Sequence, residues 1–386
     1  MLPKLTGFYH KVLLPELTLP REGKSPGIRE PGIWEKLPEY FQPWNDLASR
    51  IVELMKSKTV REHIDQLEML DHKRLSGRAE LFLAHLQLSR FVAGYVWQNG
   101  KSDPAKKIPR CIAVPFYGIS DSLSIRPTIS YCDIVLANWR PIDPKAPLTF
   151  VNIRPIISLP GGKDADNLIR QTAAVELAFT PAIQRTLDAV YATEAGDAST
   201  LAHCLEDVAA VLRKMTAMLS DIHELIDAEA LQNVVLLYCG GFGPGSPLPE
   251  GLLFEGVSDE GVTAIGASAA QTSALQLVDA ALSVQHTQDN RAIFQNHRLY
   301  MPQKHRQFVE TVEQRSQIRQ YVTSCKDEAL TSAFKNCLRC LADFRSGHIR
   351  IITKYVVMVS KNDPGNDKLV SYLKSARDET TNNEHV

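Results

Sequence analysis

The stretch from Ser324 to Val359, SCKDEALTSAFKNCLRCLADFRSGHIRIITKYVVMV, decides the predicted fold. Its apolar residues recur every three or four positions, which is the spacing of one helix face. The stripe that they form is Leu330, Phe334, Cys337 or Leu338, Leu341, Phe344, His348, Ile351 and Tyr355. Ser324 followed by Asp327 fits a capping box, which marks a helix start. The stretch therefore predicts a helical segment from Lys326 to Met358 with one buried face.

The rest of the second part of the chain follows the same pattern. Helical spacing begins at Asp164 and is strongest in Leu201, Leu205, Val208, Leu212, Met215, Leu219 and Ile222. Sixteen of the 22 prolines fall in residues 1–160, and proline is excluded from helix interiors. We therefore predict a mainly α protein with a smaller N-terminal domain, α with minor β, over residues 1–154. A large all-helical domain should occupy residues 155–386.

The first part should be broken into short elements. Residues 1–50 suggest irregular structure with short helices, and Gly77–Gln98 a longer helix. Residues 100–160 carry nine prolines and should hold turns and a small sheet or hairpin, with Ile112–Pro115 as an extended candidate. In the second part of the chain, a last pair of helical segments is expected at His305–Tyr321 and Lys326–Met358. The polar tail from Ser375 should be frayed.

Composition excludes several classes of protein. A net charge of −1 argues against a nucleic-acid binder. Seven scattered cysteines argue against a disulfide framework and for a reducing compartment. The apolar stretch Phe91–Trp97 is far shorter than the ~20 residues of a spanning helix. Because the N-terminus also lacks the pattern of a secretory signal, we expect a cytoplasmic protein without a membrane partner.

Two short motifs favour structural roles. The glycine string GGFGPGSP, Gly240–Pro247, follows a helical pattern and lacks the Lys-Ser/Thr of a phosphate loop, so we interpret it as a helix-terminating loop. Cys337 and Cys340 form a lone CxxC without the second pair of a zinc site, and we expect them to be small packing residues.

His348 is the candidate with chemical meaning. It lies in the apolar stripe, Arg345 precedes it by one helical turn, and Gly347 offers no side chain that would obstruct a flat ligand. A buried imidazole beside a fixed cation suits a b-type haem, as iron ligand and propionate partner. A core histidine bonded to a backbone carbonyl is the alternative that spacing alone favours.

Longer segments resemble the indoleamine 2,3-dioxygenase family, in its order and spacing and over most of the chain. They are RFVAGYVWQ (90–98), YCDIVLANW (131–139), VELAF (175–179), ASAAQTSALQLVDAAL (267–282), YMPQKHRQF (300–308) and FRSGHIRIITKYV (344–356). LVSYLKSAR (369–377) is similar to the family's last helix. The resemblance implies a large helical domain that holds haem b, ferrous in the active form.

The resemblance also implies roles for single residues. His348 matches the iron ligand, Arg345 the propionate partner, and Asp279 an acidic residue near the haem. Ser268 and Ala269 match a loop over the distal side. The positions that match the substrate pocket are Tyr131, Leu168, Thr172, Leu231 and Leu236. Thr172 could hydrogen-bond O₂ or the substrate amine, or else its own helix backbone.

The implied reaction inserts O₂, the co-substrate, across the indole 2,3 double bond of L-tryptophan or a related indoleamine. The product is of the N-formylkynurenine type, and an electron donor keeps the haem ferrous. Tryptophan-active members carry phenylalanines where this chain has Leu168 and Leu231, and a carboxylate-binding arginine where it has Leu236. The alternatives are therefore a related haem protein that acts on a different indole, and a non-enzymatic haem protein that binds a gas or an indole.

Overall fold

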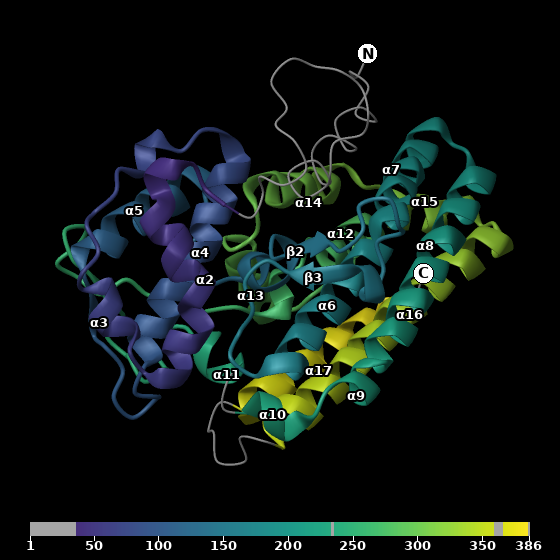
Figure 1. Cartoon of the computed structure of the whole chain (residues 1–386). Helices are drawn as coiled ribbons and strands as arrows, with labels where there is room; N and C mark the ends of the chain where they lie inside the picture. Colours follow the sequence, from purple (N-terminus) through teal and green to yellow (C-terminus); the bar gives the residue numbers. More distant parts are fainter. Residues whose placement is uncertain (1–35, 233–234, 359–365, 385–386) are drawn as a thin grey trace. The chain divides into compact units, whose positions relative to one another are not determined.

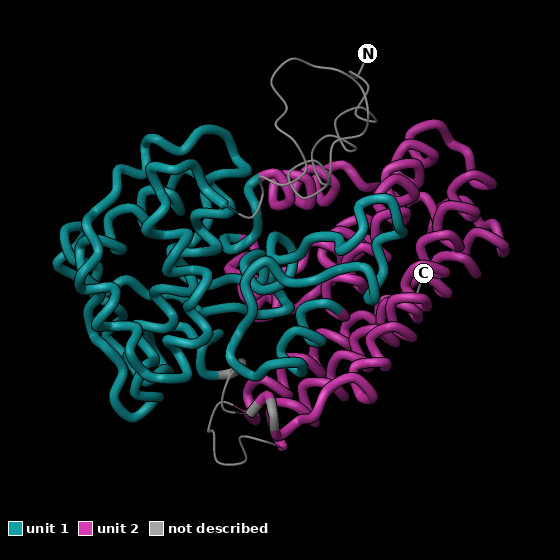
Figure 2. Tube along the Cα trace, in the orientation of Figure 1, with its two compact units in different colours: residues 1–170, 233–271, 299–303 teal, residues 171–232, 272–298, 304–386 magenta. Residues whose placement is uncertain are grey.

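The computed structural model describes residues 36–232, 235–358 and 366–384, without the side chains of residues 230, 232, 235 and 236. It is mainly helical, as predicted, with four short strands in the described part (Figure 1). The chain forms two compact units (Figure 2). Unit 1 comprises residues 1–170, 233–271 and 299–303, and unit 2 comprises residues 171–232, 272–298 and 304–386. The domain boundary between residues 154 and 155 stays a prediction.

Unit 1 is built around helix α4, which packs against α2, α3 and α5. Its α-helices are α2 (Gln42–Ser57), α3 (Val60–Ile64), α4 (Gly77–Trp97), α5 (Arg110–Leu123), α11 (Val235–Tyr238) and the first part of α6 (Gly162–Ala178). Short helical turns are η2 (Glu39–Phe41), η3 (His72–Arg74), η4 (Cys132–Leu136), η5 (Phe150–Asn152) and η6 (Ala269–Gln271). The strands are β1 (Lys107–Ile108), β2 (Trp139–Pro141), β3 (Ile153–Pro155) and β4 (Leu253–Phe254). β2 and β3 pair antiparallel, which confirms the expected hairpin, and β1 pairs parallel with β4.

The extended segment expected at Ile112–Pro115 is wrong, because these residues lie in α5. The β-branched residues beside a proline suggested a strand. A longer window shows Ile112, Phe116, Ile119 and Leu123 on one helix face, and all four are fully buried. Burial of that face outweighs the single backbone hydrogen bond that Pro115 removes. The prediction for residues 1–35 lies outside the described residues.

Unit 2 is a stack of helices in which α16 packs against α8 and α17, and α8 against α7. Its elements are the rest of α6, α7 (Thr180–Ala195), α8 (Ala198–Ser220), α9 (Ile222–Leu225), α10 (Ala228–Gln232), α12 (Ser273–Leu282), α13 (Gln288–Arg298), α14 (Gln303–Arg315), α15 (Ile318–Cys325), α16 (Glu328–Ile352), η7 (Thr353–Val357) and α17 (Asn366–Asn382). The stripes predicted on α8 and α16 are buried, except for His348, which is partly exposed. No helix of the described residues is both long and apolar enough to cross a membrane.

Helix ends in unit 2 differ from the prediction in three places. Ser324 lies inside α15, and the N-cap of α16 is Asp327, whose carboxylate accepts a hydrogen bond from the Leu330 amide at 2.9 Å. The helix expected at His305–Tyr321 is divided into α14 and α15. The tail from Ser375 is not frayed as far as the structure describes it, because α17 continues to Asn382 and buries Thr380.

Candidate functional site

His348 lies on α16, in the last two turns before the π-helical turn η7. The residue is partly exposed, yet the surrounding protein lowers the pKa of its imidazole to about 4 through burial alone. The ring is therefore neutral at pH 7 and keeps a lone pair, which is the form that binds metal. Among the described residues no group of three or more His, Cys, Asp or Glu could hold a metal ion. A single neutral imidazole is the donor that a porphyrin-bound iron takes from a protein, so His348 fits the haem expectation.

Gly347 does not serve the role that the sequence suggested. A β-carbon at this position would lie 3.6 Å from the Leu219 side chain and 3.8 Å from that of Thr216, both on α8. These are ordinary packing distances. A side chain at Gly347 would therefore point at a neighbouring helix, and Gly347 does not leave open space there for a flat ligand.

Arg345, one turn before His348, forms a buried ion pair with Asp279 of α12. Its guanidinium also donates to the Thr380 hydroxyl of α17. Burial alone would raise the pKa of Asp279, but the charges of Arg345 and His286 lower it to about 2. The pair fixes three helices around the base of His348, and it brings together the predicted residues Arg345 and Asp279.

The pair continues into residues that the sequence analysis missed. The Nε2 atom of His286 lies 3.6 Å from Asp279 Oδ2, and its Nδ1 atom lies 2.7 Å from Glu379 Oε2. Asn290 donates to Glu379 at 2.7 Å. Glu379 and Thr380 belong to the tail that was expected to be frayed. The helical pattern of residues 369–377 continues toward the C-terminus. This continuation is the signal that could have identified Glu379 and Thr380.

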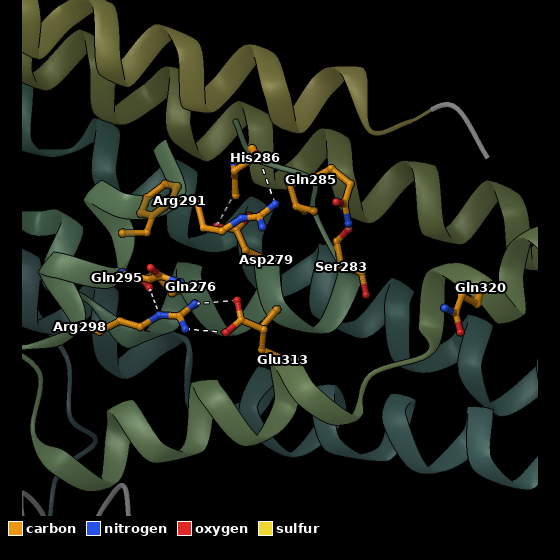
Figure 3. Close-up of a pocket in the computed structure, with 13 residues that line it drawn as sticks. Gln276, Asp279, Ser283, Gln285, His286, Arg291, Gln295, Arg298, Glu313 and Gln320 are labelled. Atoms are coloured by element: carbon orange, nitrogen blue, oxygen red, sulfur yellow. Dashed lines mark hydrogen bonds and ion pairs between the residues drawn. The ribbon is translucent and has the colours of Figure 1, made fainter. Parts of the chain in front are cut away.

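A cavity of about 500 Å³ adjoins this network (Figure 3). Asp279 and His286 line one side and point toward one another, and Arg298 lines another side, where it forms a bidentate pair with Glu313 at 2.6 and 3.1 Å. The Oδ1 atom of Asp279 is buried and accepts no hydrogen bond from the described residues. Asp279 is therefore held through one oxygen only, by Arg345 and His286.

Three predicted residues meet in unit 1 through Gln271, which the sequence analysis also missed. The buried Gln271 side chain accepts a hydrogen bond from the Tyr131 amide at 2.8 Å and donates to the Gly266 carbonyl at 2.6 Å. The Gln271 amide donates to the Ser268 carbonyl at 3.0 Å and closes the turn that contains Ala269. The Tyr131 segment and the Ser268–Ala269 turn are thus fixed to one another.

The segment that carries Tyr131 is also held from the other side. Asp133 accepts hydrogen bonds from the Ser130 amide at 2.8 Å and from His85 at 2.6 Å, and Arg90 donates to its carbonyl at 2.9 Å. All four residues are buried. This buried cluster holds the segment that carries Tyr131 against α4.

The remaining predicted pocket residues lie on helices. Leu168 and Thr172 are half-buried on α6, one turn apart. Leu231 is buried on α10, which packs against η7 directly after the helix of His348. Leu236 belongs to α11, but its side chain is outside the described part, so its role stays a prediction.

The two structural motifs behave as predicted. The glycine string follows α11, and Gly241 approaches the backbone of Ala264 so closely that a β-carbon would collide with it. Cys337 and Cys340 are both buried on α16, and burial raises the pKa of each thiol.

Comparison with known proteins adds to this geometry. A family model described as indoleamine 2,3-dioxygenase matches residues 29–385. The chain is 31% identical to indoleamine 2,3-dioxygenase 2 of Homo sapiens, over 92% of each chain. It is 32% identical to indoleamine 2,3-dioxygenase 1 of Mus musculus, over 88% of this chain and 84% of the relative. It is also 34% identical to a myoglobin of Haliotis madaka, over 90% of this chain and 93% of the relative.

Proposed function

Since the chain belongs to the indoleamine 2,3-dioxygenase family, a family of haem-dependent oxidoreductases that act on tryptophan or related indoles, we propose that it binds haem b through His348. In this proposal it inserts both atoms of O₂ across the 2,3 double bond of L-tryptophan or a related indoleamine. The product is of the N-formylkynurenine type. The observation that carries the proposal is the neutral imidazole of His348, one turn after the buried Arg345–Asp279 pair.

The protein's own groups hold and orient the reactants. His348 offers its lone pair to the iron, and Arg345 offers guanidinium N–H groups to a propionate. Tyr131 forms a wall of the indole pocket, and the Thr172 hydroxyl donates a hydrogen bond to O₂ or to the substrate amine. When bound, ferrous haem supplies the activation of O₂. Both oxygen atoms enter the product, so turnover has no net electron demand, and the protein contributes mainly orientation.

The test compares two histidines of unit 2. His348→Ala is expected to lose the spectrum of axially ligated ferrous haem and all ring-opened product from L-tryptophan and O₂. His297→Ala is the matched control, because burial alone also lowers the pKa of His297 to about 4, and we expect it to keep both. A His348→Ala protein with the wild-type ferrous spectrum contradicts the assignment.

Substrate preference is the part of the proposal that Leu236 decides. An arginine that pairs with the amino-acid carboxylate contributes about 2 kcal/mol, and leucine cannot replace it. We therefore infer that this protein prefers L-tryptophan over indoles without a carboxylate, such as tryptamine, less strongly than tryptophan-active relatives do. Leu236→Arg should raise kcat/KM for L-tryptophan about 30-fold, the equivalent of that energy, and leave tryptamine nearly unchanged. Equal changes for both substrates contradict the inference.

A second candidate function is reversible O₂ binding without ring opening. The similarity to the Haliotis myoglobin over nearly the whole chain favours it. It requires the same His348 site and differs only in the outcome with substrate. Ferrous protein that binds and releases O₂ with every indole tested, and forms no product, would establish this function in place of dioxygenation.

We propose a reducing compartment, the cytoplasm, as the site of action. All seven cysteines are free thiols, five of them buried. A reducing compartment also supplies the electron donor that keeps the haem ferrous. When cells are depleted of reductant, we expect the ferrous fraction of the protein to fall while its thiols form no disulfide.

A further inference from the structure

Four side chains of unit 2 alternate in charge from α16 to α17: Arg345, Asp279, His286 and Glu379. His286 Nε2 lies 3.6 Å from Asp279 Oδ2, too far for a hydrogen bond but close enough for an ion pair, and its Nδ1 lies 2.7 Å from Glu379 Oε2. The exposed fractions of the four side chains are only 9 to 12%. The buried charges therefore cancel only while His286 is an imidazolium.

Two carboxylates that face His286 favour that charged form, and the positive charge of Arg345 opposes it. Asp279 comes from α12, Glu379 from α17 and Arg345 from α16, while Arg291 of α13 donates to the His286 carbonyl at 3.4 Å. Burial alone would lower the pKa of His286, but the two carboxylates raise it above its ordinary value. Nearby Tyr372 on α17 stays neutral, because burial raises the pKa of its phenol.

The backbone at His286 is fixed independently of its charge. The Gln285 amide donates to Asn383 Oδ1 at 2.9 Å, and Asn383 Nδ2 donates back to the Gln285 carbonyl at 3.1 Å. Glu379 is held in turn by Asn290 at 2.7 Å. The segment between α12 and α13 is thus fastened to the end of α17, and the imidazole is directed at Asp279.

Asp279 depends on this arrangement. Its buried Oδ1 atom has no hydrogen-bond partner among the described residues, so only Oδ2 holds the carboxylate in place, and Asp279 is one of the residues that line the cavity of Figure 3. Two cations meet at Oδ2, Arg345 and His286. Without the charge on His286, the carboxylate is free to turn toward the cavity, and Arg345 loses its fixed counter-charge.

We propose that His286 is a positioning residue for the cofactor: held by Glu379, it keeps the Asp279 carboxylate against Arg345 and so fixes the Arg345 guanidinium beside a haem propionate. This inference rests on the proposed haem site and extends it to a residue and a helix, α17, that do not touch the haem. It also predicts a pH dependence. Because the pKa of His286 is raised, its contribution is complete below its ordinary value and is lost as the pH rises through the raised value.

The experiment measures haem release rather than turnover. Ferric holoprotein is mixed with excess apomyoglobin, and the transfer of haem is followed between pH 6.5 and pH 9 for wild type, His286→Gln, Glu379→Gln and the control His297→Gln. We expect His286→Gln and Glu379→Gln to release haem on the order of tenfold faster at pH 6.5, as is usual when a residue that supports a ligand is removed. Wild type and His297→Gln should accelerate toward the rate of His286→Gln as the pH rises, whereas His286→Gln itself should stay nearly constant.

The two proposals fail differently in this experiment. Release by His286→Gln at the wild-type rate, or with the same rise toward pH 9, overturns the role of His286 and leaves the haem site intact. Glu379→Gln removes the charge that holds His286 but is nearly the same size as glutamate. If His286→Gln does not fold, the haem release rate of Glu379→Gln tests the same role. A wild-type protein that takes up no haem overturns the proposed function and this inference with it.

Discussion

The Asp279–Arg345 pair should couple the two residues strongly in the free energy of unfolding. The pKa of Asp279 falls from an ordinary 3.8 to about 2 in the folded protein. Each pKa unit corresponds to about 1.4 kcal/mol, so the ionised carboxylate contributes roughly 2 kcal/mol. Since both side chains are about nine-tenths buried, solvent screening reduces this value little. Asp279→Asn leaves a buried guanidinium without its counter-charge and should cost about 3 kcal/mol or more.

The assay is a double-mutant cycle by urea unfolding of the haem-free protein at pH 7, with Asp279→Asn, Arg345→Met and the double variant. We expect the double variant to lose up to about 2 kcal/mol less than the sum of the single variants, because His286 shares with Arg345 in lowering the pKa of Asp279. Asp207→Asn, which breaks the exposed pair with Arg185, is the control and should cost less than about 1 kcal/mol. Additivity of the two single losses within about 0.5 kcal/mol refutes the coupling.

The same pair predicts a pH dependence. A carboxyl group whose folded pKa is lowered stabilises the protein fully above its unfolded value, near 3.8, and loses that contribution as the pH falls through about 2. The difference between wild type and Asp279→Asn should therefore be constant from pH 5 up to the ordinary pKa of His286, 6.5, above which the titration of His286 also changes it. It should shrink at lower pH, and a difference that instead grows on acidification contradicts the assigned charge.

Three further substitutions test the packing of the site. Gly347→Ala should raise the stability by about 0.5 kcal/mol in thermal unfolding and leave haem uptake unchanged, because the new β-carbon meets α8 at 3.6 Å; lost haem uptake would restore the idea that a ligand lies there. Gly266→Ala should cost about 3 kcal/mol by the same assay, because its φ is +74° and a β-carbon would lie 2.6 Å from the Gly241 amide; an unchanged Tm speaks against this. Gln271→Leu should raise KM for the indole while the ferrous spectrum stays normal, because the Tyr131 amide loses its acceptor; an altered spectrum with unchanged KM is the contrary result.

Helices with a wide apolar stripe were predictable from the sequence. The stripes of α8 and α16 follow the 3.6-residue period over many turns, and their burial decides the structure regardless of local propensity. Pro115 shows the limit of the method. In a short window, a proline and two β-branched neighbours favoured a strand. The longer helical period of α5, whose apolar face is buried in the core of unit 1, decides the structure instead. Ser324 failed for a related reason, because Asp327 is an equally good cap three residues later.

The candidate site was predictable only where one residue carries the chemistry. His348 and Arg345 are one turn apart on one helix, so spacing alone places them together. Asp279 was identified only from the family resemblance. It contacts Arg345 although the two residues are 66 positions apart in the sequence, so helix spacing could not predict the pair. His286, Glu379 and Gln271 were missed because each acts through another residue. A polar side chain that fixes a neighbour has the same local pattern as one that faces water.

The distribution of these contacts bears on how this chain can be similar both to proteins named dioxygenase and to a protein named myoglobin. His348, the proposed iron ligand, lies on α16 of unit 2. The neighbouring Arg345–Asp279 pair is held to α17 by Thr380 directly and by Glu379 through His286. Tyr131 and the Ser268–Ala269 turn are held separately within unit 1 by Gln271. We therefore expect substitutions at the Gln271 contacts to change what the proposed pocket binds, or to end turnover, without changing the proposed haem binding. That separation predicts that Leu236→Arg and Gln271→Leu alter substrate kinetics with the haem release rate unchanged, whereas His286→Gln alters release and leaves the ratio of tryptophan to tryptamine turnover unchanged.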